Sequence, residues 1–212
     1  MKVETKQRGL FIVFEGIDGA GKTTQIELLK KALSQRGRRV YCTAEPTESV
    51  TGGLLREALC GIHKRTAGEL AAMFVTDRIF HNVNPVNGIE KMLSDGIDVI
   101  CDRYYYSSLA YQGSETDYEW VRSMNLECPE IRRPDLCVFL DLTPEQSMER
   151  INRGRVTQEI YENTERLESV RQKFYTVFES LKERENIAVV NAYATVEQVH
   201  QAILLQVEAL RI

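Results

Sequence analysis

The chain has 212 residues, 43% of them hydrophobic, and a formal net charge of −4 at pH 7. That length and apolar fraction suit one hydrophobic core, and no linker-like stretch interrupts it, so we expect a single domain over residues 1–212. The acidic balance argues against a nucleic-acid surface, which needs a basic stripe. No apolar run is long enough to cross a bilayer, and residues 1–8 are polar, so we expect neither membrane contact nor a secretory signal.

The five cysteines follow no metal-binding or C-x-x-C spacing. Cys42, Cys101 and Cys137 lie in apolar runs, where a small buried thiol is the usual interpretation. A reducing compartment follows from this pattern, and the cytoplasm is the expected one.

The first predicted element is an apolar strand at residues 10–15, and a helical pattern follows from Thr24 to Arg36. Residues 16–23 between them match G-x-x-x-x-G-K-[ST], the phosphate-binding loop, in its proper strand-to-helix context. Glycines let backbone N–H groups close around an anion, and the helix N-terminus adds partial positive charge. Lys22 can then reach the outer phosphates of ATP, and the Thr23 hydroxyl can bind Mg²⁺. The predicted ATP site comprises Gly16, Ile17, Asp18, Gly19, Ala20, Gly21, Lys22, Thr23 and Thr24.

Four more apolar runs, at residues 39–43, 97–101, 136–142 and 187–191, alternate with segments of helical periodicity. This alternation predicts an α/β fold with a five-stranded, mostly parallel sheet and helices on both faces. Because ligands bind at the carboxyl ends of the strands in such folds, the residues just after each strand are the candidates for a site.

A helix is expected from about Thr66 to Leu93, with Phe74 and Arg78 one turn apart on the same face. An aromatic ring and a guanidinium at this spacing can bind the base and phosphate of one nucleotide. Phe74 also continues an apolar stripe that includes Leu70 and Ala71, so core packing explains it equally well.

Asp102 and Arg103 follow the third predicted strand. A carboxylate at this strand end, across from the phosphate loop, can hold Mg²⁺ directly or through water, while a turn or N-cap aspartate is the alternative. Arg103 adds a guanidinium whose fork binds two phosphate oxygens at once. Asp141 after the fourth strand is expected to be structural, because Thr143 and Gln146 form the pattern of a capping box.

Arg150, Arg153 and Arg155 lie at the end of the next predicted helix, and Gly154 is expected to interrupt it. A run of charges is usually a solvated helix end. The alternative is a mobile lid over about residues 150–164, whose arginines stabilise the charge of a transferred phosphoryl group and whose closure excludes water. A monophosphate acceptor is already a nucleophile and needs cations more than a base, so Arg78 and Arg103 together with the lid arginines favour a nucleoside monophosphate kinase.

Several segments resemble the thymidylate kinase family, namely residues 14–25, Glu45-Pro46, Phe74 with Asp77-Arg78, and residues 102–113. The resemblance implies a phosphate-loop nucleoside monophosphate kinase fold, phosphoryl transfer from ATP to dTMP with Mg²⁺, and a homodimer. Some members of the family carry an extra basic residue in the phosphate loop, and others carry it in the lid. With Gly19 in the loop and Arg153 and Arg155 in the lid, this chain resembles the second, bacterial-like type. The chain departs from that pattern at Thr47-Glu48, where glycines are usual.

The resemblance also implies roles for individual residues. The dTMP set comprises Glu45, Pro46, Phe74, Arg78, Arg103, Ser107, Ser108, Tyr111 and Gln112, with thymine stacked on Phe74, Arg78 and Arg103 on the phosphate, and Tyr111 in the place of a ribose 2′-hydroxyl. The catalytic set comprises Lys22, Arg103, Arg153 and Arg155. The metal set comprises Asp18, Thr23 and Asp102.

Two alternatives remain open at this point. A deoxynucleoside kinase, or another nucleoside monophosphate kinase, shares the phosphate loop and an acidic-Arg pair after the third strand. A GTP-dependent switch protein would carry an N-K-x-D motif for guanine, which this sequence lacks.

Overall fold

The computed structural model describes residues 8–154 and 164–210, and within helix α7 it describes side chains only up to Arg150. Arg155 and most of the expected lid therefore lie outside the described residues, as does the side chain of Arg153.

Five strands form one sheet in the order β2-β3-β1-β4-β5, and every neighbouring pair is parallel. The strands are β1 (Phe11–Glu15), β2 (Val40–Ala44), β3 (Asp98–Asp102), β4 (Leu136–Asp141) and β5 (Ile187–Asn191). The predicted α/β fold with a five-stranded sheet is confirmed, with strand bounds within about one residue of those expected.

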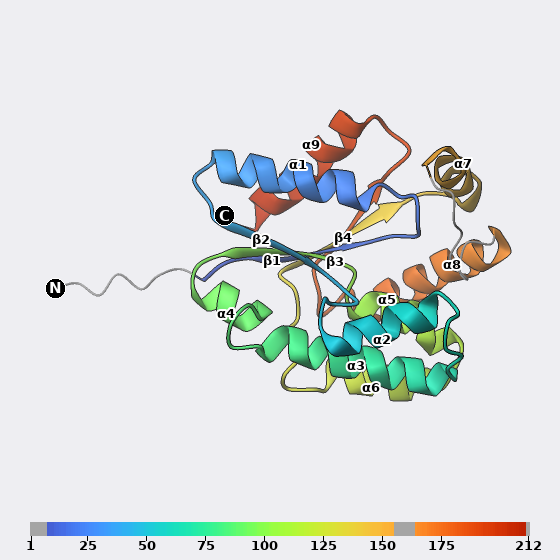
Figure 1. The fold of residues 1–212 in the computed structure, drawn as a ribbon. Coiled ribbons are helices and arrows are strands. Elements are labelled where there is room, and N and C mark those ends of the chain that lie inside the picture. Colours follow the sequence, from blue (N-terminus) through green and yellow to red (C-terminus); the bar gives the residue numbers. More distant parts are fainter. Residues whose placement is uncertain (1–7, 155–163, 211–212) are drawn as a thin grey trace.

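Helices cover both faces of the sheet (Figure 1). On one face lie α1 (Lys22–Gln35) and α9 (Val196–Ala209), while most of the others pack on the opposite face. The remaining helices are α2 (Val50–Leu59), α3 (Ala67–Val83), α4 (Ile89–Ser94), α5 (Tyr105–Ala110), the 3₁₀ turn η1 (Gln112–Ser114), α6 (Tyr118–Leu126), α7 (Pro144–Gly154) and α8 (Thr164–Leu181).

The central strand β1 is buried on both sides. Phe11 and Val13 belong to the core under α3–α6 and α8, whereas Ile12 and Phe14 belong to the core under α1 and α9. This division follows from the strand geometry, because successive side chains point to opposite faces. Phe14 pairs in register with Asp102 of β3, so the carboxyl ends of β1 and β3 lie side by side. These ends carry the predicted site residues.

The prediction of one helix from Thr66 to Leu93 is wrong. The chain forms α3, which ends at Val83, and a separate short α4, which begins at Ile89. Asn84 has an extended ψ of 122° because Pro85 follows it, and a residue before proline disfavours the helical conformation. The start is as expected, since Thr66 and Glu69 form a capping box.

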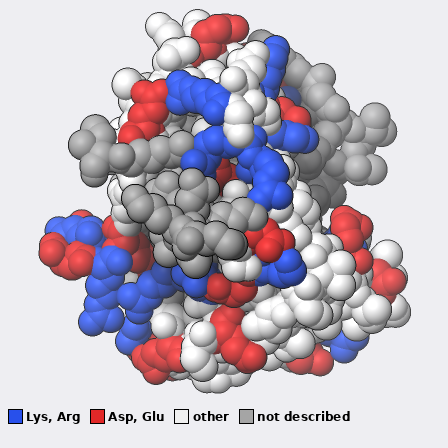
Figure 2. Space-filling model, turned by 90° about the vertical axis from the view of Figure 1, so that its left-hand side faces the viewer, with Lys and Arg blue, Asp and Glu red and all other residues white. Residues whose placement is uncertain are grey.

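Charge is mixed over the surface. On the face shown in Figure 2, Lys and Arg side chains lie among Asp and Glu instead of forming a stripe. Arg8, for example, is paired with Asp135, and Arg38 with Asp98. Among the helices that the structure describes, none is long and apolar enough to cross a membrane.

Candidate active site

The phosphate loop joins β1 to α1 as the sequence predicts. Gly16 and Gly21 adopt φ values of 144° and 92°, which L side chains rarely reach, and a Cβ on Gly16 would lie 2.7 Å from the Leu140 carbonyl oxygen. The N-cap of α1 is Gly21, which brings no capping side chain. The first N–H groups of α1 therefore face the loop without a side-chain partner, as an anion site requires.

Lys22 lies under this loop and is 8% exposed. Its Nζ donates to the Gly16 carbonyl oxygen at 3.1 Å. Burial lowers the pKa of Lys22, and the nearby Arg103 guanidinium lowers it further, while Asp102 and Asp18 act in the opposite direction. The ammonium group is thus a buried cation beside the carboxyl ends of β1 and β3.

Asp102 ends β3 opposite the loop. Its Oδ1 is buried and has no hydrogen-bond partner among the described residues. A turn or N-cap role would give that oxygen an N–H partner, so a cation is the better match for it. Asp102 and Thr23 line the same pocket, and a carboxylate with a hydroxyl is a donor set that suits Mg²⁺.

Arg103 extends from β3 toward the phosphate loop. Its φ is 67°, a left-handed value that is uncommon for a residue other than glycine and that concentrates at functional sites. The guanidinium forms an ion pair with Asp18, donates to Ser107 Oγ at 3.3 Å, and lies 5.7 Å from the centre of the Tyr111 ring. It therefore stands between the loop and helix α5.

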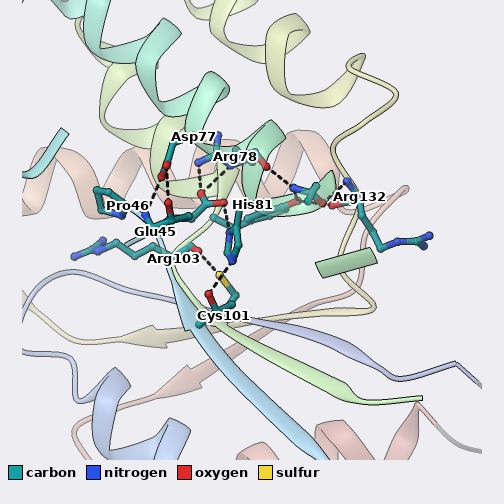
Figure 3. A network of polar contacts seen from close by, with 12 residues as sticks. Glu45, Pro46, Asp77, Arg78, His81, Cys101, Arg103 and Arg132 are labelled. Atoms are coloured by element: carbon teal, nitrogen blue, oxygen red, sulfur yellow. Dashed lines mark hydrogen bonds and ion pairs between the residues drawn. The ribbon is translucent and has the colours of Figure 1, made fainter. Parts of the chain in front are cut away.

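Glu45 and Arg78 form a buried pair beneath the pocket (Figure 3). Arg78 is 1% exposed, and its Nε and Nη2 donate to Glu45 Oε2 at 2.9 and 2.6 Å. Arg78 also donates to Ser108 and Asn125, and the second Glu45 oxygen lies 3.0 Å from His81 Nδ1. The positive charge of Arg78 is therefore balanced by a carboxylate next to the cis Glu45–Pro46 bond.

The residue before Arg78 has a separate partner. Asp77 accepts hydrogen bonds from the Thr47 backbone N–H at 2.8 Å and from the hydroxyls of Thr47, Ser49 and Thr51 at 2.7 to 2.8 Å. These bonds lower the pKa of Asp77 although burial opposes them. Hydroxyl side chains thus fix the turn before α2.

These parts line one pocket of about 670 Å³. From the phosphate loop and β3 come Asp18, Gly19, Gly21, Lys22, Thr23, Thr24, Asp102 and Arg103. From the other elements come Glu45, Pro46, Phe74, Arg78, Ser107, Ser108, Tyr111 and Gln112. Three predicted loop residues, Gly16, Ile17 and Ala20, are buried and are not part of this lining.

Comparison with known proteins gives the same assignment as the motifs. The sequence model described as thymidylate kinase matches residues 14–203. The chain belongs to the thymidylate kinase family. Relatives named "Probable thymidylate kinase" from Pyrococcus horikoshii and Thermococcus gammatolerans are each 39% identical to it, over 95% and 94% of the chain and 97% and 96% of the relative. A relative of the same name from Methanococcus aeolicus is 39% identical over 92% of the chain and 93% of its own length.

The resemblance to the thymidylate kinase family is thus confirmed. Sequence reasoning nevertheless missed several pocket residues, namely Ala44, Arg56, Leu59, Cys60 and Tyr104. Arg56 lies on helix α2, a helix that the sequence patterns do not predict. Its guanidinium donates to the carbonyl oxygens of Thr47 and Pro46 at 2.5 and 3.2 Å. Ser49 followed by apolar residues at helical spacing was the signal for that helix, and Ser49 is its N-cap.

Arg150 does not end in solvent. Its guanidinium donates to the Ala192 carbonyl oxygen at 2.9 Å and lies 3.4 Å from the Gly19 carbonyl oxygen, so it joins the phosphate loop to the segment before α9. Asp141, as expected, is structural and forms an ion pair with Arg171 at 2.7 Å. The capping box of Thr143 and Gln146 is confirmed.

Phe74 both packs in the core and faces the pocket, which the sequence analysis treated as alternatives. It packs beside the small core cluster of Leu55, Ala58 and Leu70, and it also lines the pocket. One side chain can serve both roles, so the position of Phe74 is compatible with stacking on a nucleotide base.

Proposed function

We propose that this chain transfers the γ-phosphoryl group of ATP to dTMP, giving dTDP and ADP. The observation that carries the proposal is one continuous pocket with a phosphate loop on one side and an aromatic ring with guanidiniums on the other. Such a pocket brings two phosphorylated nucleotides together, which is most of what phosphoryl transfer requires.

On the donor side, the N–H groups at the start of α1 and the Lys22 ammonium bind the ATP phosphates. Thr23 and Asp102 would hold Mg²⁺, which would neutralise charge on the β- and γ-phosphates. The described residues contain no cluster of three or more His, Cys, Asp or Glu side chains arranged to hold a metal. That composition suits a cation that takes most of its ligands from the nucleotide and water.

On the acceptor side, Phe74 stacks on thymine, and Ser108 and Gln112 surround the base and sugar. Tyr111 occupies the place of a ribose 2′-hydroxyl, which favours a deoxynucleotide. Ser107, Glu45 and Pro46 complete this side of the pocket.

Guanidiniums supply the positive charge for the acceptor phosphate. Both Arg103 and Arg78 are paired with a carboxylate, but Arg103 is 22% exposed and stands between the phosphate loop and α5, whereas Arg78 is 1% exposed. Arg103 therefore carries the larger share. Arg56 adds a third guanidinium from α2. Arg153 and Arg155 stay predicted catalytic residues that complete the charge on the moving phosphoryl group.

A hydroxyl acceptor, as in a deoxynucleoside kinase, would need a free carboxylate as its base. Glu45 is held by Arg78 and His81, and Asp18 is paired with Arg103. Glu15, the buried carboxylate at the end of β1, has both oxygens engaged by α5. Asp102 also lines the pocket and has an unpartnered Oδ1 among the described residues, but the proposal assigns it to Mg²⁺. With Asp102 on the metal and the other carboxylates paired, a phosphate acceptor, which requires no base, is favoured.

The proposal includes a homodimer in the cytoplasm. Val50 and Leu54 of α2, and Phe80 and Val83 of α3, are exposed apolar side chains on two helices that pack together. Burying such side chains against a second copy removes them from water. The cysteines are free thiols, as a reducing compartment would keep them.

A coupled assay of ADP release tests the activity. We expect dTMP to be the best acceptor among dTMP, dUMP, dGMP, dCMP and thymidine. Thymidine as the best acceptor would replace the proposal with a nucleoside kinase, and dGMP or dCMP would replace it with another monophosphate kinase. A Lys22→Met preparation serves as the control for contaminating kinases.

A further inference from the structure

Glu15, the last residue of β1, is a carboxylate buried between the two halves of the pocket. Its side chain is fully enclosed. Oε1 accepts from the Tyr104 backbone N–H at 2.9 Å and from the Ser107 N–H at 3.1 Å, and Oε2 accepts from the Ser107 hydroxyl at 2.7 Å. Both oxygens are thus engaged by one short segment of the chain.

That segment is the start of α5. The N-cap of α5 is Tyr104, which provides no side-chain cap of its own. The first N–H groups of a helix have no partner within the helix, so a buried helix start needs acceptors from elsewhere. Glu15 supplies an acceptor for two of these N–H groups, those of Tyr104 and Ser107, from β1, an element 89 residues before Tyr104 in the chain. The Ser107 N–H also donates to the Tyr104 carbonyl oxygen at 3.1 Å.

Arg103 lies directly before this capped segment. Its own N–H donates to the Phe14 carbonyl oxygen at 2.9 Å, and its carbonyl oxygen accepts from Cys101 Sγ at 3.0 Å. The next N–H, that of Tyr104, is held by Glu15. Two consecutive residues of β1 therefore hold Arg103 in its left-handed conformation from both sides, and that conformation sends its guanidinium toward the phosphate loop.

We propose that Glu15 is a positioning residue, which places Arg103 for phosphoryl transfer by capping α5 from the strand that leads into the phosphate loop. Phosphoryl transfer depends on charges set in place before the reaction, and a displacement of about 1 Å at the reacting centre costs on the order of 10²-fold in rate. The role needs acceptor atoms at this position and does not need a negative charge.

Glu15→Met and Glu15→Gln separate these requirements. Met fills a similar volume but offers only a weak thioether acceptor, whereas the Gln carbonyl accepts from both N–H groups and its amide donates to the Ser107 hydroxyl. We expect Glu15→Met to lower kcat for dTMP by about 30-fold or more with KM for ATP changed less than about threefold. We expect Glu15→Gln to keep kcat within about threefold of the parent.

The matched control is Asp117→Ala, which removes a carboxylate cap from the N-terminus of α6, where Asp117 accepts from the Trp120 N–H at 2.7 Å. Asp117 does not line the pocket, so the control should lower the melting temperature and leave kcat unchanged. A folded Glu15→Met enzyme with normal kcat overturns the proposal. A folded Glu15→Gln enzyme whose kcat falls by about 30-fold or more overturns it too, because the charge and not the cap would then matter. This arm is measured against the parent enzyme, so it does not depend on the folding of Glu15→Met.

Discussion

At the scale of single residues, Asp102 Oδ1 is a buried polar atom of the site whose burial needs an explanation. A buried oxygen without a hydrogen bond costs about 1–3 kcal/mol, and the Asp102 Oδ1 is such an oxygen among the described residues. An apolar residue at this strand end would avoid that cost, which supports the proposal that Asp102 binds Mg²⁺ in the reaction.

The first prediction follows from this carboxylate and from Lys22. Asp102→Asn should lower kcat by about 10²-fold or more, because it weakens the binding of Mg²⁺ at the transferred phosphate. Lys22→Met should lower kcat by a similar factor, because it removes a positive charge from the ATP phosphates. Turnover at saturating ATP and dTMP, with circular dichroism to confirm folding, measures the effect. Near-normal turnover would remove the substituted residue from the mechanism.

The second prediction concerns Phe74, which is partly buried at the pocket wall. If stacking on thymine is its main role, Phe74→Leu should weaken dTMP binding by roughly 1–3 kcal/mol and change the ligand-free melting temperature little. Calorimetric titration with dTMP and a thermal melt of the same sample measure both. A large loss of melting temperature with unchanged affinity would favour core packing.

At the scale of elements, consecutive residues of α3 organise the turn between β2 and α2. Asp77 holds Thr47, Ser49 and Thr51, while Arg78 holds Glu45. The turn carries the pocket residue Pro46, and its carbonyl oxygens bind Arg56. Helix α3 therefore determines the shape of the part of the pocket that we assign to dTMP.

The third prediction tests that arrangement. In Asp77→Asn, an NH₂ group replaces one carboxylate oxygen. Either the Thr47 N–H or the three hydroxyls of Thr47, Ser49 and Thr51 then lose their acceptor on residue 77. We expect the free energy of unfolding to fall by about 1–3 kcal/mol and KM for dTMP to rise more than KM for ATP. Glu57→Gln on the exposed side of α2 is the control for loss of one negative charge. Equal changes in the KM values for dTMP and ATP would mean that Asp77 does not shape the dTMP side of the pocket.

The elements that sequence predicted well are those specified by local patterns. The phosphate loop and β1 follow from glycine spacing and an apolar run, and both are where the sequence places them. Helix α2 was missed because two adjacent glycines, Gly52 and Gly53, weaken its propensity, whereas in the structure Gly52 is needed, since a Cβ would lie 1.9 Å from the Thr47 carbonyl oxygen. The pairing of Arg78 with Glu45, 33 residues apart, depends on tertiary packing that no local pattern encodes.

At the scale of the whole molecule, stability depends on two acids, Glu15, which is fully buried, and Glu185, which is partly buried. Burial raises the pKa of Glu15 to about 7 against the lowering influence of Arg103, two hydrogen bonds and Lys22. Burial also raises the pKa of Glu185, whose carboxylate accepts from Tyr105 and Tyr106. Both acids hold a proton more tightly in the folded protein than in the unfolded chain.

The fourth prediction is the pH dependence that follows. The stabilisation from a raised carboxyl pKa is fully present below the unfolded value of about 4.5 and is lost as pH rises through the folded value, about 7 for Glu15. Between pH 5 and 8 these groups should lower the free energy of unfolding, Glu15 by at most about 3 kcal/mol. Urea unfolding of Glu15→Gln at both pH values should show a smaller fall than the parent. An identical fall would mean that Glu15 does not titrate in this range.

The strand order also governs what happens while the chain is being synthesised. β1 is made first, yet it lies at the centre of the sheet between β3 and β4. Until residue 136 has left the ribosome, the edge of β1 that pairs with β4 has no neighbour, and an open edge on a mostly apolar strand pairs readily with other chains. We therefore expect a nascent chain that is stalled or truncated before β4 to aggregate more readily than the complete chain and to need a chaperone more.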